Sequence, residues 1–201
     1  MMNRRDVLKI AAAGSVVTAL SVPVLAQSSP SVEEVLFDPE IPALGNPGGN
    51  VTVAEYFDYQ CPFCKRGHSE LLDLVREDGN VRLVMKDWPI FGGASVHASS
   101  LVLASGDSYE KALNALMATP GRLGKDEVDA TLSKAGLDPS ALLAAFKKDM
   151  DRVDGILARN MDQANAFGFG GTPAFIIGTR IYHGAMDRQA LLEAIAAARA
   201  G

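Results

Sequence analysis

The chain has 201 residues, a length that suits one domain and is sufficient to bury a hydrophobic core. Hydrophobic residues make up 48% and charged residues 21%, which argues against a disordered or fibrous chain. The formal net charge of −5 argues against a nucleic-acid partner, because nucleic acids are polyanions.

The first 26 residues have the pattern of an export signal. Arg4 and Arg5 give a basic start, an apolar run follows from Ile10 to about Leu20, and Val24-Leu25-Ala26 offers a cleavage site. That run is shorter than the ~20 residues of a membrane-spanning helix. The arginine pair also resembles a twin-arginine signal; an ordinary secretory signal and an uncleaved anchor are the alternatives. We therefore predict a periplasmic protein, in a compartment where disulfides persist.

Residues 27–49 are rich in Ser, Pro, Gly and Asn, and we interpret them as an N-terminal extension with one short strand near Val32–Phe37. Residues 51–57 are β-branched or aromatic and predict a buried strand. A short loop, Asp58-Tyr59-Gln60, leads from this strand to the first cysteine, Cys61.

A helix is predicted to begin at Cys61, because Pro62 fits the first helical turn. Its apolar stripe places Cys64 towards the core and leaves Cys61 nearer solvent, at the helix start. The stripe consists of Cys64, His68, Leu71, Leu72 and Val75. Asp78-Gly79-Asn80 ends the helix, and residues 81–85 predict a second strand. Strand, helix and strand form a βαβ unit, so the two strands should be parallel.

An alanine-rich helical block is predicted from about 94 to 166, with a helix start at Asp138 and a break at Gly155 or within 149–151. The pattern then changes to two short strands, 173–177 and 180–183, joined by Gly178-Thr179. Asp187 is predicted to cap a final helix. The order βαβ, helical block, ββα predicts an α/β fold.

Two cysteines three positions apart allow three interpretations. As a structural disulfide, so short a loop would stabilise the fold by only ~2 kcal/mol. A zinc site needs four ligands, and the chain offers only two cysteines and three histidines without a second paired spacing. A redox pair benefits from the short spacing, because one thiol must reach the other while a mixed disulfide is present. We favour the redox pair.

The position of the pair on the helix predicts a role for each cysteine. Unpaired N–H groups and the helix dipole at a helix N-terminus stabilise an anion and lower the pKa of a cysteine there. Cys61 is therefore the candidate nucleophile and Cys64 the candidate resolving thiol. We treat His68, His97 and His183 as non-catalytic, and assign Trp88 and Phe91 to core packing, with part of a substrate-binding surface as the alternative.

Two segments resemble those of DsbA-type proteins of the thioredoxin superfamily: Phe57-Asp58-Tyr59-Gln60-Cys61-Pro62-Phe63-Cys64 and Gly170-Gly171-Thr172-Pro173-Ala174-Phe175. The resemblance covers about residues 50–201 and implies a thioredoxin fold with a helical insertion between its halves. It implies that Pro173 is a cis-proline facing the cysteines, that Thr172 touches and tunes the site, and that Glu55 is a buried acid that exchanges protons with Cys64. Lys86 is a candidate partner for Glu55, with a plain surface lysine as the alternative.

The resemblance implies a protein disulfide oxidoreductase that acts on folding secreted proteins, and a redox partner that resets the pair. Pro62-Phe63 between the cysteines, in place of Pro-His, and Thr172 keep a reductase or isomerase open as an alternative. A copper-binding module using the two thiols is a further alternative. No organic cofactor motif is visible, and the short extension favours a monomer.

Overall fold

The computed structural model describes residues 29–201, and the predicted export signal at 1–26 lies outside this range. A five-stranded sheet with the order β1-β3-β2-β4-β5 forms its centre. Strands β2 and β3 are parallel, and every other neighbouring pair is antiparallel. The strands are β1 (Ala43–Gly45), β2 (Val51–Phe57), β3 (Val81–Asp87), β4 (Ala174–Ile177) and β5 (Arg180–His183). The predicted α/β thioredoxin fold is confirmed, and β3 extends two residues beyond the predicted strand.

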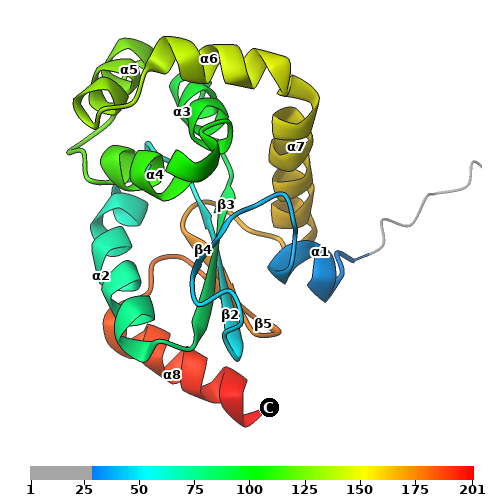
Figure 1. Ribbon diagram of the computed structural model, residues 1–201. Helices are drawn as coiled ribbons and strands as arrows, with labels where there is room; N and C mark the ends of the chain where they lie inside the picture. The colour runs from blue at the N-terminus through cyan, green and yellow to red at the C-terminus, as the bar shows by residue number, and fades with distance from the viewer. Residues whose placement is uncertain (1–28) are drawn as a thin grey trace, which may run out of the picture.

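The helices cover the two faces of the sheet and one of its ends (Figure 1). Helices α2 and α8 lie on one face and α1 and α7 on the other, while α3 to α6 form a block beyond one end of the strands. Their bounds are α1 Val32–Leu36, α2 Pro62–Asp78, α3 Gly93–Leu103, η1 Gly106–Ser108, α4 Tyr109–Met117, α5 Lys125–Lys134, α6 Pro139–Lys148, α7 Met150–Ala166 and α8 Arg188–Ala200. The helical block predicted between the two halves of the fold is present as α3 to α7.

Helix α2 begins and ends where the sequence signals predict. Cys61 is its N-cap in extended conformation, and Pro62 occupies the first turn, where its missing N–H leaves no hydrogen bond unmade. Gly79 ends the helix in the left-handed region, with φ of 68°, which glycine adopts at little cost. The buried stripe contains Leu74 in place of the predicted Leu72, which is half-buried.

The predicted strand near Val32–Phe37 is wrong, because this segment forms helix α1. The side chain of Ser31 accepts a hydrogen bond from the N–H of Glu34, whose carboxylate accepts one from the N–H of Ser31. This reciprocal capping satisfies two backbone donors at the helix start. The extension nevertheless supplies a strand further on, since β1 pairs with β3 at the edge of the sheet.

Helices α6 and α8 begin at aspartate caps, as predicted. Asp138 accepts a hydrogen bond from the N–H of Ser140, and Asp187 accepts one from the N–H of Ala190, as expected of N-caps. The long helical segment after Asp138 divides at Asp149, within the predicted 149–151 region and not at Gly155.

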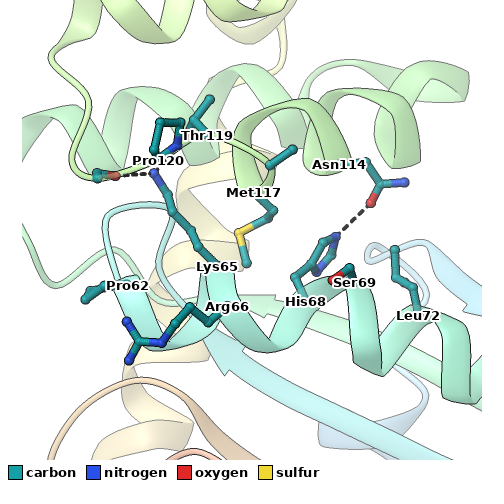
Figure 2. Close-up of a pocket in the computed structure, with 12 residues that line it drawn as sticks. Pro62, Lys65, Arg66, His68, Ser69, Leu72, Asn114, Met117, Thr119 and Pro120 are labelled. Carbon is teal, nitrogen blue, oxygen red and sulfur yellow. Dashed lines mark hydrogen bonds between the residues drawn. The ribbon is translucent and has the colours of Figure 1, made fainter.

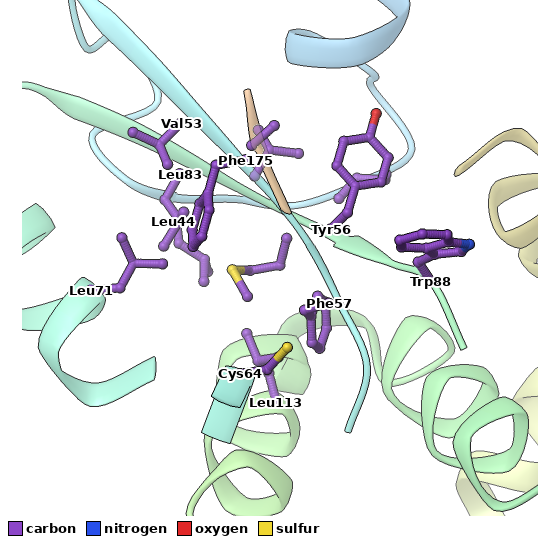
Figure 3. Packing of buried hydrophobic residues seen from close by; sticks show 14 of the residues in the cluster. Leu44, Val53, Tyr56, Phe57, Cys64, Leu71, Leu83, Trp88, Leu113 and Phe175 are labelled. Carbon is purple, nitrogen blue, oxygen red and sulfur yellow. The ribbon is translucent and has the colours of Figure 1, made fainter. Parts of the chain in front are cut away.

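Every residue of β2 is buried, because the strand has a neighbour on each side and helices on both faces. Figure 3 shows Cys64 pointing into this core near Phe57 and Leu113, while Tyr56 and Trp88 lie on the other side of the sheet. Trp88 is 4% exposed, which confirms its core assignment. Phe91 is 40% exposed with the Arg122 guanidinium 5.1 Å from its ring centroid, so its core assignment is wrong.

Candidate active site

The two cysteines lie at the carboxyl end of β2, where the chain turns into α2. The Sγ atom of Cys61 accepts a hydrogen bond from the N–H of Cys64 at 3.4 Å and lies 3.2 Å from the carbonyl oxygen of Thr172, to which the thiol donates while it is protonated. Both cysteines are free, and both are 1% exposed. Cys61 lies at the helix start as expected, and the loop that carries Thr172 packs against its sulfur, so that neither cysteine exposes appreciable surface.

The surroundings of the two sulfurs shift their pKa values in opposite directions. A hydrogen bond from the Cys64 side chain, with further ones from the N–H groups of Cys64 and Phe63, lowers the pKa of Cys61 from 9.0 to about 6, against an opposing effect of burial. Burial, the hydrogen bond with Cys61 and the charge of Glu55 raise the pKa of Cys64. At neutral pH the pair is one thiolate and one thiol, the arrangement needed by a nucleophile and a resolving partner.

Sheet pairing brings the Thr172-Pro173 loop to the cysteines across more than 100 residues of sequence. Strand β4 runs antiparallel to β2 with Ala174 opposite Tyr56, so the residues just before β4 lie at the end of β2 from which Cys61 follows. The Thr172–Pro173 peptide bond is cis, as expected. The structure thus brings together Cys61, Cys64, Thr172 and Pro173.

Glu55 is buried inside the sheet beneath the cysteine pair. It lies in the central strand β2, between Met85 of β3 and Phe175 of β4, and is 2% exposed, which excludes a surface position on an edge strand. Burial, and then the charge of Cys61, raise the pKa of Glu55 from 4.5 to about 8. Its Oε2 atom has no hydrogen-bond partner, and the residue lines a cavity of about 350 Å³. A carboxyl group that holds its proton at neutral pH therefore lies close to Cys64.

Lys86 does not pair with Glu55, and that expectation is wrong. Side chains alternate across a strand, so Lys86, which is opposite Tyr56, points to the other face of the sheet from Glu55. There it forms a buried ion pair with Asp38 at 3.7 Å and donates to the carbonyl of Glu34 at 3.2 Å. Burial lowers the pKa of Lys86 to about 8. Lys86 thus anchors the N-terminal segment and stays apart from the cysteines.

Two residues of the loop before Cys61 have structural roles that sequence reasoning missed. Asp58 Oδ1 accepts from the N–H of Gln60 at 2.7 Å, and Asp58 Oδ2 accepts from the N–H of Phe91 at 3.0 Å. Gln60 Oε1 accepts from the N–H of Leu123 at 2.6 Å. These bonds join the cysteine loop to the loops before α3 and before α5. The partners lie 33 and 63 positions away, so no local pattern could have found them.

Each histidine has a partner away from the cysteine sulfurs. His68 is 5% exposed, and its Nε2 lies 2.7 Å from Asn114 Oδ1, which fits a buried helix-packing position. His97 pairs with Asp129 at 2.7 Å. His183 meets the ring of Phe169 edge-on, with 5.4 Å between the centroids.

Residues 38–197 match the family model described as Thioredoxin. A thioredoxin-like oxidoreductase from Silicibacter pomeroyi DSS-3 is 36% identical, with a TM-score of 0.81 over 86% of this chain and 99% of that one. The thiol-disulfide exchange protein alpha-DsbA2 from Wolbachia pipientis is 25% identical, with a TM-score of 0.75 over 82% and 90%. A periplasmic thioredoxin-like protein from Salmonella enterica serovar Typhimurium is also 25% identical, with a TM-score of 0.75 over 84% and 95%.

Among curated proteins, the Na(+)/H(+) antiporter NhaA 1 of Salinispora arenicola is 29% identical over 160 residues. The match covers 75% of this chain and only 24% of the antiporter, so the chain spans about a quarter of the length of that relative. Across residues 29–201, every helix is too short or too polar to cross a bilayer.

The family match spans most of the chain, and the three solved structures named above are described as thiol-disulfide exchange or thioredoxin-like proteins. The chain belongs to the thioredoxin family, as a DsbA-like member of the superfamily.

Proposed function

We propose that this protein is an exported thiol–disulfide oxidoreductase that donates the Cys61–Cys64 disulfide to thiols of folding proteins. The observation that carries the proposal is the unequal pair of sulfurs: a stabilised thiolate at Cys61, beside the Thr172-Pro173 loop, and a protonated thiol at Cys64. The solved relatives that are described as a thioredoxin-like oxidoreductase and a thiol-disulfide exchange protein support it.

The donation takes two steps. A substrate thiolate attacks Sγ of Cys61, which breaks the Cys61–Cys64 bond and forms a mixed disulfide, while Cys64 leaves and takes up a proton. A second substrate thiolate then attacks the substrate sulfur of the mixed disulfide, and Cys61 leaves as a thiolate. Two electrons pass from the substrate to the pair, and Glu55 is the buried acid placed to supply the proton that Cys64 needs.

The thiolate of Cys61 makes the reduced pair more stable and the disulfide more oxidising. At pH 7 an ordinary thiol with a pKa of 9.0 is still protonated. The reduced pair is therefore stabilised only over the interval between the Cys61 pKa of about 6 and the ambient pH of 7. One pKa unit corresponds to about 1.4 kcal/mol, which shifts a two-electron couple by about 30 mV. The lowered pKa therefore favours the disulfide donor over a reductase by a modest margin.

The first experiment is to equilibrate the purified protein with glutathione buffers of known ratio and to measure the reduced fraction of Cys61–Cys64 by thiol alkylation and mass spectrometry. A potential near about −120 mV supports the donor. A potential of about −200 mV or below overturns the donor in favour of a reductase or isomerase. A pair that does not exchange with glutathione overturns the redox function, and copper binding then becomes the leading alternative.

Export to the periplasm is part of the proposal. It rests on Arg4, Arg5 and the apolar run after them, and the relative from Salmonella enterica is itself described as periplasmic. The twin-arginine route, the substrates among folding secreted proteins, the redox partner and the monomeric state remain proposals of the same kind. Exchange of Arg4 and Arg5 for lysine tests the route, since we expect export to stop while the protein still accumulates inside the cell.

A further inference from the structure

A second cavity lies on another side of α2 from the cavity of Glu55. It has a volume of about 560 Å³ and lies between α2, the end of α4 and the Thr119-Pro120-Gly121 loop (Figure 2). It begins at Pro62, the residue after Cys61. A polypeptide joined to Cys61 through a mixed disulfide therefore has its neighbouring residues within reach of this cavity.

The lining combines apolar walls with positive charge. Leu72 and Pro120 supply apolar surface, and the buried Met117 closes the wall behind them. Lys65 and Arg66 supply two cations, and the lining contains no aspartate or glutamate, although the chain as a whole carries a net charge of −5.

The Glu55 cavity has the opposite character. Its lining includes Glu55, Glu70 and Asp187 and shares with the second cavity only Arg66. The two cavities therefore differ in charge on either side of the active-site helix. Arg66 lines both cavities and Glu55 is protonated at neutral pH, so the contrast comes from Lys65 in the second cavity and from Glu70 and Asp187 in the other.

Polar groups in the second cavity have unused hydrogen-bonding capacity. Lys65 Nζ donates to Thr119 Oγ1 at 2.9 Å and to the carbonyl of Gly121 at 2.5 Å, which leaves one of its three N–H groups for a further acceptor. His68, 5% exposed, is bonded to Asn114 through Nε2, while its Nδ1 has no partner. Figure 2 shows these side chains reaching between the two helices.

We propose that this cavity binds the stretch of substrate polypeptide next to the reacting cysteine, and that it selects a stretch with an apolar and an acidic side chain. The apolar side chain packs against Leu72 and Pro120, and the carboxylate lies by Lys65 and Arg66. This inference rests on the proposed function, because it assigns a substrate preference to the same cysteine pair.

The test uses the oxidised protein and an excess of short peptides, each with one cysteine next to leucine and then glutamate, glutamine or lysine. A peptide thiolate attacks Cys61 and breaks the Cys61–Cys64 bond; a second peptide thiolate then releases a disulfide-linked peptide dimer and the reduced protein. The rate is followed by acid quench, alkylation and mass spectrometry. We expect the glutamate peptide to react about threefold faster than the glutamine peptide, and the lysine peptide more slowly.

The variants are compared through the ratio of the glutamate-peptide rate to the glutamine-peptide rate. The two peptides are the same for every variant, so a change in this ratio between variants does not depend on the intrinsic reactivity of the peptide thiols. Lys65→Gln should lower this ratio, because only Arg66 is then left beside the carboxylate, and Lys65→Arg should restore it. Lys148→Gln, which removes the same charge from the exposed surface of α6, should leave it unchanged. In the wild type, added salt should also lower the ratio, a result that does not depend on how any variant folds.

The outcomes separate the two proposals. If no peptide reduces the oxidised protein, the proposed function fails. If all peptides react at equal rates, exchange stands and the selective cavity is refuted. A glutamate preference that is undiminished in Lys65→Gln refutes the assignment to this cavity.

Discussion

Replacement of Glu55 by glutamine should make the reduced protein more stable at alkaline pH, by an amount that grows with pH. Glu55 is 2% exposed, and burial raises its pKa from 4.5 to about 8. Between these two values the folded protein holds a proton that the unfolded chain has released. The folded state binds more protons, so the free energy of unfolding falls as the pH rises through this range and levels off above it.

The size of the effect follows from the width of the interval. About 3.5 pH units at 1.36 kcal/mol each give about 4 to 5 kcal/mol of stability lost by the wild type between pH 4.5 and pH 8. Glutamine has nearly the same shape and does not ionise, so the Glu55→Gln variant does not suffer this loss. The difference in unfolding free energy between variant and wild type should therefore grow by about 1.4 kcal/mol per pH unit.

The measurement is urea unfolding followed by circular dichroism at pH 5, 6, 7 and 8, under reducing conditions. Comparison of two proteins at each pH cancels the other groups that titrate in this range, including Lys86. Glu70→Gln, on the exposed face of α2, removes the same charge at the surface and should run parallel to the wild type. Parallel curves for Glu55→Gln and the wild type would show that Glu55 is ionised in the folded protein and would refute the proton-donor role.

Three further predictions follow from the same contacts. Absorbance of the thiolate at 240 nm should titrate with a midpoint near 6 in the wild type and in Cys64→Ser, and at a higher pH in Cys64→Ala, because alanine removes the side-chain donor to Cys61. Gln60→Ala leaves the partly buried N–H of Leu123 without its acceptor and should lower the unfolding free energy by about 1 kcal/mol in urea. Asp38→Ala leaves Lys86 buried and uncompensated and should cost about 3 to 5 kcal/mol, much of which Lys86→Met should recover in the double variant; additive losses in that double variant would contradict the ion pair.

Local sequence signals predicted most of the elements correctly. The start of α2 follows from Cys61-Pro62, and its end from Gly79, because capping and backbone preference act within one turn. Asp138 and Asp187 predict their helices for the same reason. The error at α1 has a local cause as well: the apolar residues suggested a strand, while the Ser31–Glu34 capping pair stabilised a helix.

The sequence predicted a redox pair from two local features, the spacing of the two cysteines and their position at a helix start. Local features suffice there because the reactivity of a thiol depends on nearby hydrogen-bond donors. Tertiary structure alone decided the rest. Only the fold shows that Cys61 is covered, that Glu55 and Lys86 face opposite sides of the sheet, and that Asp58 and Gln60 bind loops 33 and 63 residues away. Burial and pairing between distant segments depend on how the strands assemble, and no window of sequence contains both partners.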